Sequence, residues 1–280
     1  MRDIDVQEVE NVVKKLCIEA NYFIGNDIKE ALIKYKEEEP YDVAEDVLEK
    51  IIINDEIAEK KEVPMCQDTG MACVFLEVGQ DVHFVGGNIE EFINEGVRKG
   101  YKEGYLRKSV VKDPIDRVNT KDNTPAIIYY NIVPGDKVKI TVAPKGFGSE
   151  NMSRIGMLKP ADGIEGVKRF ILETVKLAGP NPCPPMVIGV GIGGTFDKAA
   201  YLAKKALIRP INIRNDNKFY KDLEEELLEK INELGIGPQG FGGKTTALGL
   251  NIETYPTHIA GLPVAVNINC HATRHKEFIL

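Results

Sequence analysis

The stretch Met186-Val187-Ile188-Gly189-Val190-Gly191-Ile192-Gly193-Gly194 constrains the fold more than any other part of the sequence. Its first five residues form a short apolar run, which is typical of a buried strand. The glycines that follow lead into a helical pattern over residues 195–206. A buried strand that passes directly into a helix is a unit of mixed folds, so this stretch predicts a structure in which strands and helices alternate.

The same alternation continues on both sides. Residues 6 to about 60 have helical periodicity with a break at Glu39-Pro40, so the N-terminal fifth of the chain is predicted to be helical. Further strands are predicted at 72–78, 126–133, 137–142, 246–252 and 263–268, and further helices at 89–102, 163–177 and 218–234. Pro134-Gly135-Asp136 predicts a hairpin turn between two of the strands. We expect a mixed α/β (α+β) fold in one domain, residues 1–280, with a candidate hinge between two lobes at the proline-rich segment 179–185.

Composition excludes several classes of function. The chain has 280 residues, 43% of them hydrophobic, which is enough to bury a large core. Its net charge of -7 and the absence of a basic stripe argue against binding to nucleic acid. The acidic start and the lack of a long apolar run predict a cytoplasmic protein without a signal peptide or membrane span. Five cysteines in a reducing compartment are expected to be thiols or metal ligands rather than disulfides.

The cysteines fall into two groups by their sequence settings. Cys17 lies on the apolar face of a predicted helix and Cys73 in a predicted buried strand, so both are expected to be structural. Cys66, Cys183 and Cys270 lie beside polar or turn-forming residues, as thiolates gathered from three loops around one metal would. Three thiolates at a cubane cluster leave one iron open to act as a Lewis acid. Spacing alone leaves inert cysteines and a structural zinc site as open alternatives.

Two glycine motifs offer a competing hypothesis. Glycines 189, 191 and 194 form a GxGxxG pattern between a predicted strand and helix, which suggests a nucleotide-binding oxidoreductase. The strand expected next is interrupted by Pro210, and a tight strand-to-helix turn, whose exposed amides could still bind an anion, is the favoured alternative. The segment 242–246 imitates the end of a P-loop, but Pro238 stands where its first glycine belongs. His258, in a loop before the strand that leads to Cys270, is a candidate for a role near the metal or a structural histidine.

Three segments together closely resemble the class I, iron–sulfur fumarate hydratase family. They are Met65-Cys66-Gln67-Asp68-Thr69-Gly70, the glycine-rich Ala143-Pro144-Lys145-Gly146-Phe147-Gly148-Ser149-Glu150-Asn151, and the run from 235–263 to Asn269-Cys270-His271. In some members of this family one polypeptide carries two domains, and in others these are separate α and β subunits. L-tartrate dehydratase has the split form. The chain resembles the α subunit alone, over essentially its whole length.

The resemblance implies a [4Fe–4S] cluster held by Cys66, Cys183 and Cys270, whose open iron grips the substrate hydroxyl and one carboxylate. It also implies that Gln67 and Asp68 face the substrate, with Asp68 in a proton relay, although an Asx turn is the alternative role for Asp68. Arg107 matches the family's carboxylate clamp, for which a guanidinium is suited.

The remaining implied contacts come from Gly146 and Gly148, which would present backbone amides to the other carboxylate, and from His258, which would donate a hydrogen bond or a proton. Family members usually have a third glycine where this chain has Phe147.

The implied reaction is the reversible hydration of fumarate to (S)-malate, a step of the tricarboxylic acid cycle. The family's site is completed by a second domain, so the resemblance implies a β-subunit partner, an α2β2 assembly and no activity of this chain alone. L-tartrate dehydratase is the closest alternative, since its substrate differs by one hydroxyl. Because no oxidation occurs, the cluster would act as a Lewis acid rather than as an electron carrier.

Overall fold

The computed structural model describes all residues from 1 to 280 and divides them into two compact units. The first unit comprises residues 1–24, 54–147 and 274–280, and the second comprises residues 25–53 and 148–273. The chain therefore passes between the units at four points. The segment 179–185, expected to be a hinge, lies inside the second unit.

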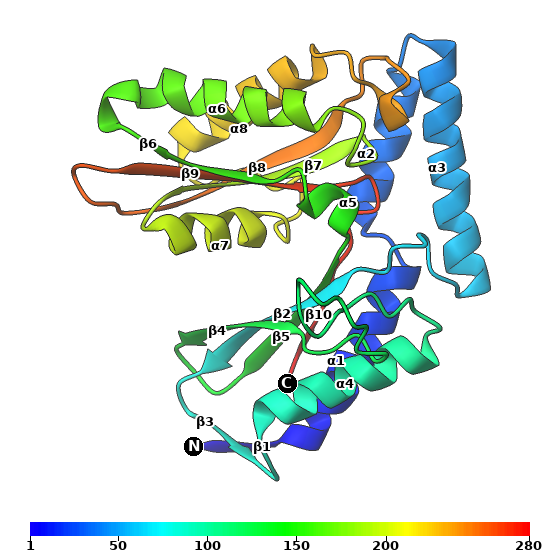
Figure 1. The fold of residues 1–280 in the computed structure, drawn as a ribbon, viewed down its shortest axis with the longest axis vertical. Coiled ribbons are helices and arrows are strands. Elements are labelled where there is room, and N and C mark those ends of the chain that lie inside the picture. Colours follow the sequence, from blue (N-terminus) through cyan, green and yellow to red (C-terminus); the bar gives the residue numbers. More distant parts are fainter. The chain divides into compact units, whose positions relative to one another are not determined.

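The first unit is built on a four-stranded sheet with the order β10-β5-β2-β4. Helices α1 and α4 lie side by side along it (Figure 1). A separate parallel pair joins β1 and β3. The elements of this unit are β1 (Arg2–Asp5), α1 (Val6–Tyr22), β2 (Met71–Gly79), β3 (Val82–Val85), α4 (Ile89–Glu103), β4 (Ile127–Val133), β5 (Val138–Lys145) and β10 (Lys276–Ile279).

Helix α1 forms where the sequence predicts it. Asp5 caps its N-terminus through Oδ1, which accepts a hydrogen bond from the Gln7 amide at 2.8 Å. Its apolar residues recur every three or four positions, and Cys17 among them is fully buried. Two glycines of α4 let this helix pack closely against α1. A Cβ at Gly96 would lie 2.6 Å from the Glu10 carbonyl oxygen, and one at Gly100 would lie 2.8 Å from Cys17 Cβ. These helices bury one face of the sheet.

The predicted hairpin between the strands at 126–133 and 137–142 is wrong. Strands β4 and β5 are not neighbours, because β2 lies between them, parallel to β4 and antiparallel to β5. The Pro134-Gly135-Asp136 connection instead crosses the end of β2, where the Gly79 amide donates to the Lys137 carbonyl at 2.8 Å. The most apolar of the three strands takes the central, most buried position, which a local turn signal does not reveal.

The second unit is a sheet with the order β6-β9-β7-β8 and helices on both faces. Helices α6 and α8 cover one face and α7 covers the other (Figure 1). Its elements are α2 (Asn26–Glu37), β6 (Arg154–Leu158), α6 (Gly163–Ala178), β7 (Met186–Gly193), α7 (Phe196–Ala206), α8 (Lys218–Asn232), β8 (Ala247–Tyr255), β9 (Leu262–Asn269) and the short 3-10 helices Pro160–Asp162 and Pro238–Gly240. Two helices cross the unit boundaries, α3 (Asp42–Lys61) and α5 (Phe147–Glu150).

The glycines of the opening stretch have a packing function. A Cβ at Gly189 would overlap the Ala203 carbonyl oxygen of α7, and one at Gly191 would overlap that of Ala199. Strand β7 is buried along its whole length, and α7 lies directly on it. The glycine pattern therefore allows a helix to pack against the sheet backbone.

The mixed α+β class is confirmed, as are the predicted helices and strands to within a few residues at their ends. Strands β1, β3, β6 and β10 and the short helix α5 were not predicted. No helix combines the length and apolar character needed to cross a bilayer.

Candidate functional site

Cys66 lies in a well-anchored loop of the first unit, residues 65–70, called here the Cys66 loop. The loop connects α3 to β2. Just before the cysteine, the Met65 amide donates to the Asn21 carbonyl at 3.0 Å, and the Met65 carbonyl accepts from Asn54 Nδ2 at 2.9 Å. Cys66 is half-buried, and its Sγ lies 3.5 Å from Oε1 of the exposed Gln67. The thiol is thus accessible on a fixed backbone.

Asp68 closes an Asx turn in this loop. Its Oδ1 accepts from the Gly70 amide at 3.0 Å, and its Oδ2 accepts from the Phe147 amide at 2.9 Å. The carboxylate is therefore held in one orientation by two backbone donors from distant parts of the sequence. The structural role of Asp68 is established by these bonds, while its role as a proton relay stays a prediction.

Buried side chains donate hydrogen bonds to the backbone carbonyls of the Cys66 loop. Tyr101 Oη donates to the Thr69 and Gly70 carbonyls at 2.8 and 3.1 Å, and Asn123 Nδ2 donates to the Gly70 carbonyl at 3.1 Å. Burial raises the pKa of Tyr101 well above its ordinary value, so the phenol remains a donor. These supporting residues were not predicted, because buried polar groups in apolar surroundings leave no local pattern.

A further buried donor, Arg274, also reaches this loop. Its Nη2 donates to the Asp68 carbonyl, and its side chain is only 5% exposed. Arg274 lies just before β10, in the last short segment of the first unit. The only sequence signal was its position four residues after Cys270.

Arg107 is tied to the Cys66 loop through its backbone. Thr69 Oγ1 accepts from the Arg107 amide at 2.9 Å and donates to the Arg107 carbonyl at 3.2 Å. Leu106 beside it is 1% exposed, which fixes the segment in the core. The Arg107 side chain is exposed, so its guanidinium is available to a ligand. The structure therefore brings Arg107 to the loop that bears Cys66 and Asp68.

The glycine-rich segment after β5 reaches Asp68 through its first residues. A Cβ at Gly146 would lie 3.3 Å from Asp68 Oδ2, so a side chain here would crowd the carboxylate. The amide that bonds Asp68 belongs to Phe147, the position where this chain departs from the glycine usual in the family. Gly148 begins the part of the chain that belongs to the second unit, and a Cβ there would meet only the Asn181 carbonyl oxygen, at 3.8 Å.

Cys183 and Cys270 lie at the same end of the sheet in the second unit. Cys183 precedes β7 and Cys270 follows β9, and these strands are antiparallel, with Val187 opposite Asn269. The His271 amide donates to the Cys183 carbonyl at 3.2 Å. Cys183 is exposed with a positive φ of 53°, a conformation that costs a non-glycine residue about 1 kcal/mol or more. Sheet topology therefore brings these two cysteine positions together.

The structure contains no group of three or more His, Cys, Asp or Glu side chains arranged to hold a metal ion. Cys66 belongs to the first unit, whereas Cys183 and Cys270 belong to the second. The predicted three-cysteine ligand set therefore stays a prediction.

His258 lies at the other end of β9 from Cys270. It occupies the exposed loop between β8 and β9, where its Nδ1 accepts from the Ala260 amide at 3.2 Å. The neighbouring Thr257 Oγ1 donates to the Gly194 carbonyl at 2.9 Å, which anchors this loop to the far end of β7. Strand β9 has 8 residues, which at about 3.3 Å per residue separate the two ends by about 25 Å. Within the second unit His258 is thus remote from Cys183 and Cys270.

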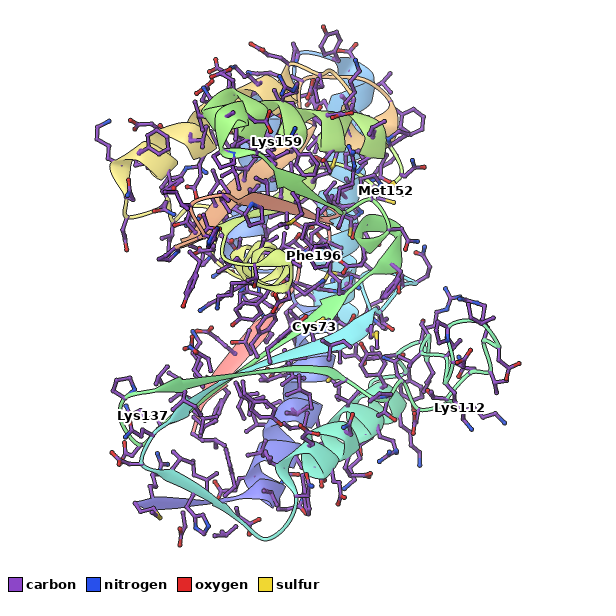
Figure 2. The ribbon with its side chains drawn as sticks, turned by 60° about the vertical axis from the view of Figure 1, so that its left-hand side comes forward. Cys73, Lys112, Lys137, Met152, Lys159 and Phe196 are labelled. Atoms are coloured by element: carbon purple, nitrogen blue, oxygen red, sulfur yellow. The ribbon has the colours of Figure 1, made fainter.

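The two cysteines predicted to be structural are confirmed as core residues. Cys17 is 0% and Cys73 4% exposed, and Cys73 lies in strand β2 (Figure 2). Burial raises the pKa of the Cys17 thiol to about 12, so it stays protonated at neutral pH. Cys66, Cys183 and Cys270 are all at least partly exposed. Accessibility divides the five cysteines as the sequence predicts.

The P-loop-like segment binds an internal carboxylate. Glu39, 7% exposed, accepts from the Lys244 and Thr245 amides at 2.9 Å each and from Thr245 Oγ1 at 2.7 Å. The Lys244 and Thr245 amides are thus used within the second unit. Together with the packing role of Gly189 and Gly191, this gives both glycine motifs a structural role, while the nucleotide-binding alternative stays untested.

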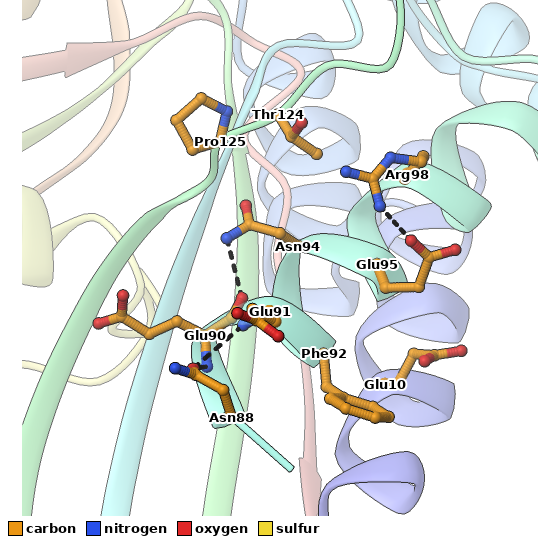
Figure 3. A pocket seen from close by; sticks show the side chains of 10 residues that line it. All are labelled: Glu10, Asn88, Glu90, Glu91, Phe92, Asn94, Glu95, Arg98, Thr124 and Pro125. Atoms are coloured by element: carbon orange, nitrogen blue, oxygen red, sulfur yellow. Dashed lines mark hydrogen bonds and ion pairs between the residues drawn. The ribbon is translucent and has the colours of Figure 1, made fainter.

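A hollow of about 650 Å³ lies beside α4 in the first unit (Figure 3). Its lining is rich in glutamates, two of which form ion pairs: Glu10 pairs with Lys99 at 2.5 Å and Glu95 pairs with Arg98. Asn88 caps α4 by accepting from the Glu90 amide at 2.9 Å. None of the predicted site residues lines it.

Comparison with known proteins identifies the class of the chain. The model of the family described as fumarate hydratase (Fumerase) matches residues 10–279. A Methanocaldococcus jannaschii protein provisionally named L(+)-tartrate dehydratase subunit alpha is 47% identical over 274 residues, which is 95% of both chains. The L(+)-tartrate dehydratase subunit alpha of Escherichia coli O157:H7 is 32% identical over 279 residues, which is 98% of this chain and 91% of the relative.

These matches indicate a hydro-lyase, an enzyme class that adds or removes water. The chain belongs to the fumarate hydratase (Fumerase) family.

Proposed function

We propose that this chain is the α subunit of an iron–sulfur hydro-lyase that reversibly hydrates fumarate to (S)-malate. The observation that carries the proposal is the division of the cysteines. Cys66, Cys183 and Cys270 are accessible in loops, whereas Cys17 and Cys73 are buried, in a chain that the family model covers almost completely. Cysteines that form no disulfide suit the reducing cytoplasm, where we place the protein.

We propose that Cys66, Cys183 and Cys270 together hold a [4Fe–4S] cluster. The residues fit such a group in donor chemistry, since thiolate is the ligand that iron–sulfur clusters require. All three thiols are at least partly exposed, so a cluster can reach them. Cys183 and Cys270 also lie at the same end of one sheet. When bound, a cluster with one iron lacking a protein ligand would supply a Lewis acid for the substrate hydroxyl and carboxylate.

The chain's own residues would bind and orient the substrate. The exposed Arg107 guanidinium, held near the Cys66 loop by Thr69, would clamp one carboxylate. Gln67 and Asp68 would face the substrate from the residues that follow Cys66. Asp68, fixed by the Gly70 and Phe147 amides, would accept or pass a proton from a defined position.

We propose that Gly146 and Gly148 present amides to the other carboxylate and that His258 makes a polar contact with the substrate. The Phe147 amide is directed to Asp68, so this segment also sets the position of the proposed acid–base group. Because His258 lies at the other end of β9 from Cys270, it would contact a substrate held by Cys183 and Cys270 only if it came from a second copy of the chain in the assembly.

A β subunit would complete the enzyme. The relatives are named as alpha subunits, which supports a partner of this kind. We propose an α2β2 assembly in which the β subunit supplies the remaining cationic groups and the base. The isolated chain is then expected to be inactive.

L-tartrate is the second candidate substrate, because both relatives described above carry the name L(+)-tartrate dehydratase. The two reactions are distinguished by measuring kcat/KM of the complex of α and β subunits for (S)-malate and for L-tartrate. A preference of at least tenfold for (S)-malate supports the first candidate, and the reverse preference replaces it with the second.

The ligand assignment is tested by replacing each of the five cysteines with alanine and measuring iron per chain after anaerobic reconstitution. We expect Cys66→Ala, Cys183→Ala and Cys270→Ala to lose the intact cluster. Cys17→Ala and Cys73→Ala are matched controls that keep it, because their thiols are in the core. Equal iron content in all five variants would rule out the assignment.

A further inference from the structure

Arg274 carries a buried positive charge that the chain does not neutralise. The residue is 5% exposed, and its Nη2 donates to the Asp68 carbonyl. Its Nε and Nη1 are buried and have no hydrogen-bond partner. A buried cation is normally paired, because removing it from water without a partner is strongly unfavourable. Within the chain, these two donors have no hydrogen-bond partner.

The ionisable groups near Arg274 do not form an ion pair with it. The ionisable groups around it include Tyr101, whose phenol remains protonated, and the carboxylate of Asp68. Asp68 directs its two oxygens at the Gly70 and Phe147 amides and gives Arg274 only its backbone carbonyl. No ion pair of the chain includes Arg274. By contrast, Arg209 is paired with Glu224 and Glu253.

The position of Arg274 links it to the proposed site at two points. Through Asp68 it holds the peptide group two residues after Cys66. Along the chain it follows Cys270 by four residues, and Thr273 Oγ1 donates to the Cys270 carbonyl at 3.0 Å. The same short segment, residues 270–274, thus bears a proposed thiolate ligand at one end and the unpaired cation at the other.

We propose that Arg274 is a positioning residue for substrate binding, which orients the Cys66 loop and reserves its positive charge for the carboxylates of the dicarboxylate substrate. This inference rests on the proposed function and extends it to a residue that no comparison assigns. A dicarboxylate is negative, so a fixed, weakly hydrated guanidinium beside Asp68 would attract it. Arginine suits this positioning role better than lysine, because the planar guanidinium has several N–H donors. One of them, Nη2, bonds the Asp68 carbonyl, while Nε and Nη1 remain available to another acceptor.

The inference predicts an opposite pattern of stability and binding for two variants. Arg274→Met replaces an unpaired buried charge by an apolar side chain of similar length, so the melting temperature of the chain should stay the same or rise. Succinate binding to the complex of α and β subunits should weaken at least tenfold. Arg209→Met is the matched control: it strands the fully buried Glu224, so the melting temperature should fall while succinate binding is unchanged.

The experiment measures melting temperature and the Kd of succinate for the reconstituted complex. Succinate is a dicarboxylate without a double bond or hydroxyl, so binding is measured without turnover. Arg274→Lys should recover part of the affinity, because it restores the charge without the planar donors. With (S)-malate as substrate, KM should rise more than kcat falls in Arg274→Met.

Two results overturn the inference. If Arg274→Met lowers the melting temperature and leaves the Kd of succinate unchanged, Arg274 is a structural residue and the proposed function stands without it. If the wild-type complex binds no succinate and converts no dicarboxylate, both the proposed function and the inference fail.

Discussion

Thr69→Val tests how the fold positions Arg107. Thr69 is 2% exposed, and its hydroxyl makes two hydrogen bonds, from the Arg107 amide at 2.9 Å and to the Arg107 carbonyl at 3.2 Å. Valine has nearly the same shape but cannot make either bond. Each neutral hydrogen bond contributes about 1 kcal/mol net, so the free energy of unfolding should fall by about 2 kcal/mol.

The functional effect should be larger on binding than on turnover. Without Thr69 Oγ1 the backbone of Arg107 is no longer fixed relative to the Cys66 loop, and the exposed guanidinium has more conformations to lose on binding. We expect KM for (S)-malate to rise about tenfold, which corresponds to about 1.4 kcal/mol. The assays are urea unfolding of the chain and steady-state kinetics of the complex of α and β subunits.

Thr141→Val is the matched control, because Thr141 is 3% exposed in β5 of the same unit and lies away from the Cys66 loop. It should change KM by less than twofold. If Thr69→Val unfolds as the wild type does and retains its KM, then Thr69 does not hold Arg107 and the proposed carboxylate clamp loses its structural support.

Three further predictions concern the framework of the site. Glu39→Gln should lower the free energy of unfolding by about 2 kcal/mol in urea titrations, because it weakens charge-assisted bonds from Lys244 and Thr245; an unchanged midpoint would show that this contact is dispensable. Gly191→Ala should lower it by more than 3 kcal/mol, since its Cβ would overlap the α7 backbone, whereas Gly261→Ala, whose nearest contact is 3.8 Å, should be neutral; equal effects would contradict the packing role of the glycine. The raised pKa of Cys17, from 9.0 to about 12, means that the folded state holds the thiol proton more tightly. The contribution of this proton to the free energy of unfolding is complete below pH 9 and is lost as pH rises toward 12. Relative to Cys17→Ala, the wild type should lose about 4 kcal/mol of stability over this range; parallel curves of stability against pH for the two proteins would refute this.

Local sequence patterns predicted the elements that bury apolar residues at a regular period. Helix α1 and strands β2 and β7 are examples, since each shows its periodicity or apolar run within one window. The predicted hairpin after β4 was wrong because the pairing of β2 with both β4 and β5 is set by burial across the sheet. Strands β1 and β10, with 4 residues each, are too short to show a period.

Only the chemically reactive residues of the candidate site, such as its cysteines, were predictable from the sequence. The distinction between accessible and buried cysteines followed from their immediate neighbours. The contacts that orient Asp68 did not, because Phe147 and Arg274 lie 79 and 206 positions away in sequence. Such contacts arise from long-range packing, and only the structure shows them.

The central claim is that this chain holds a substrate-accessible iron–sulfur cluster through three of its five cysteines. The most direct test is the iron and acid-labile sulfide content of the chain after anaerobic reconstitution, together with its visible and EPR spectra before and after addition of (S)-malate. The account predicts about four iron and four sulfide per chain and a spectrum that (S)-malate perturbs. A folded chain that takes up no iron, or a cluster whose spectrum ignores every dicarboxylate, would contradict it.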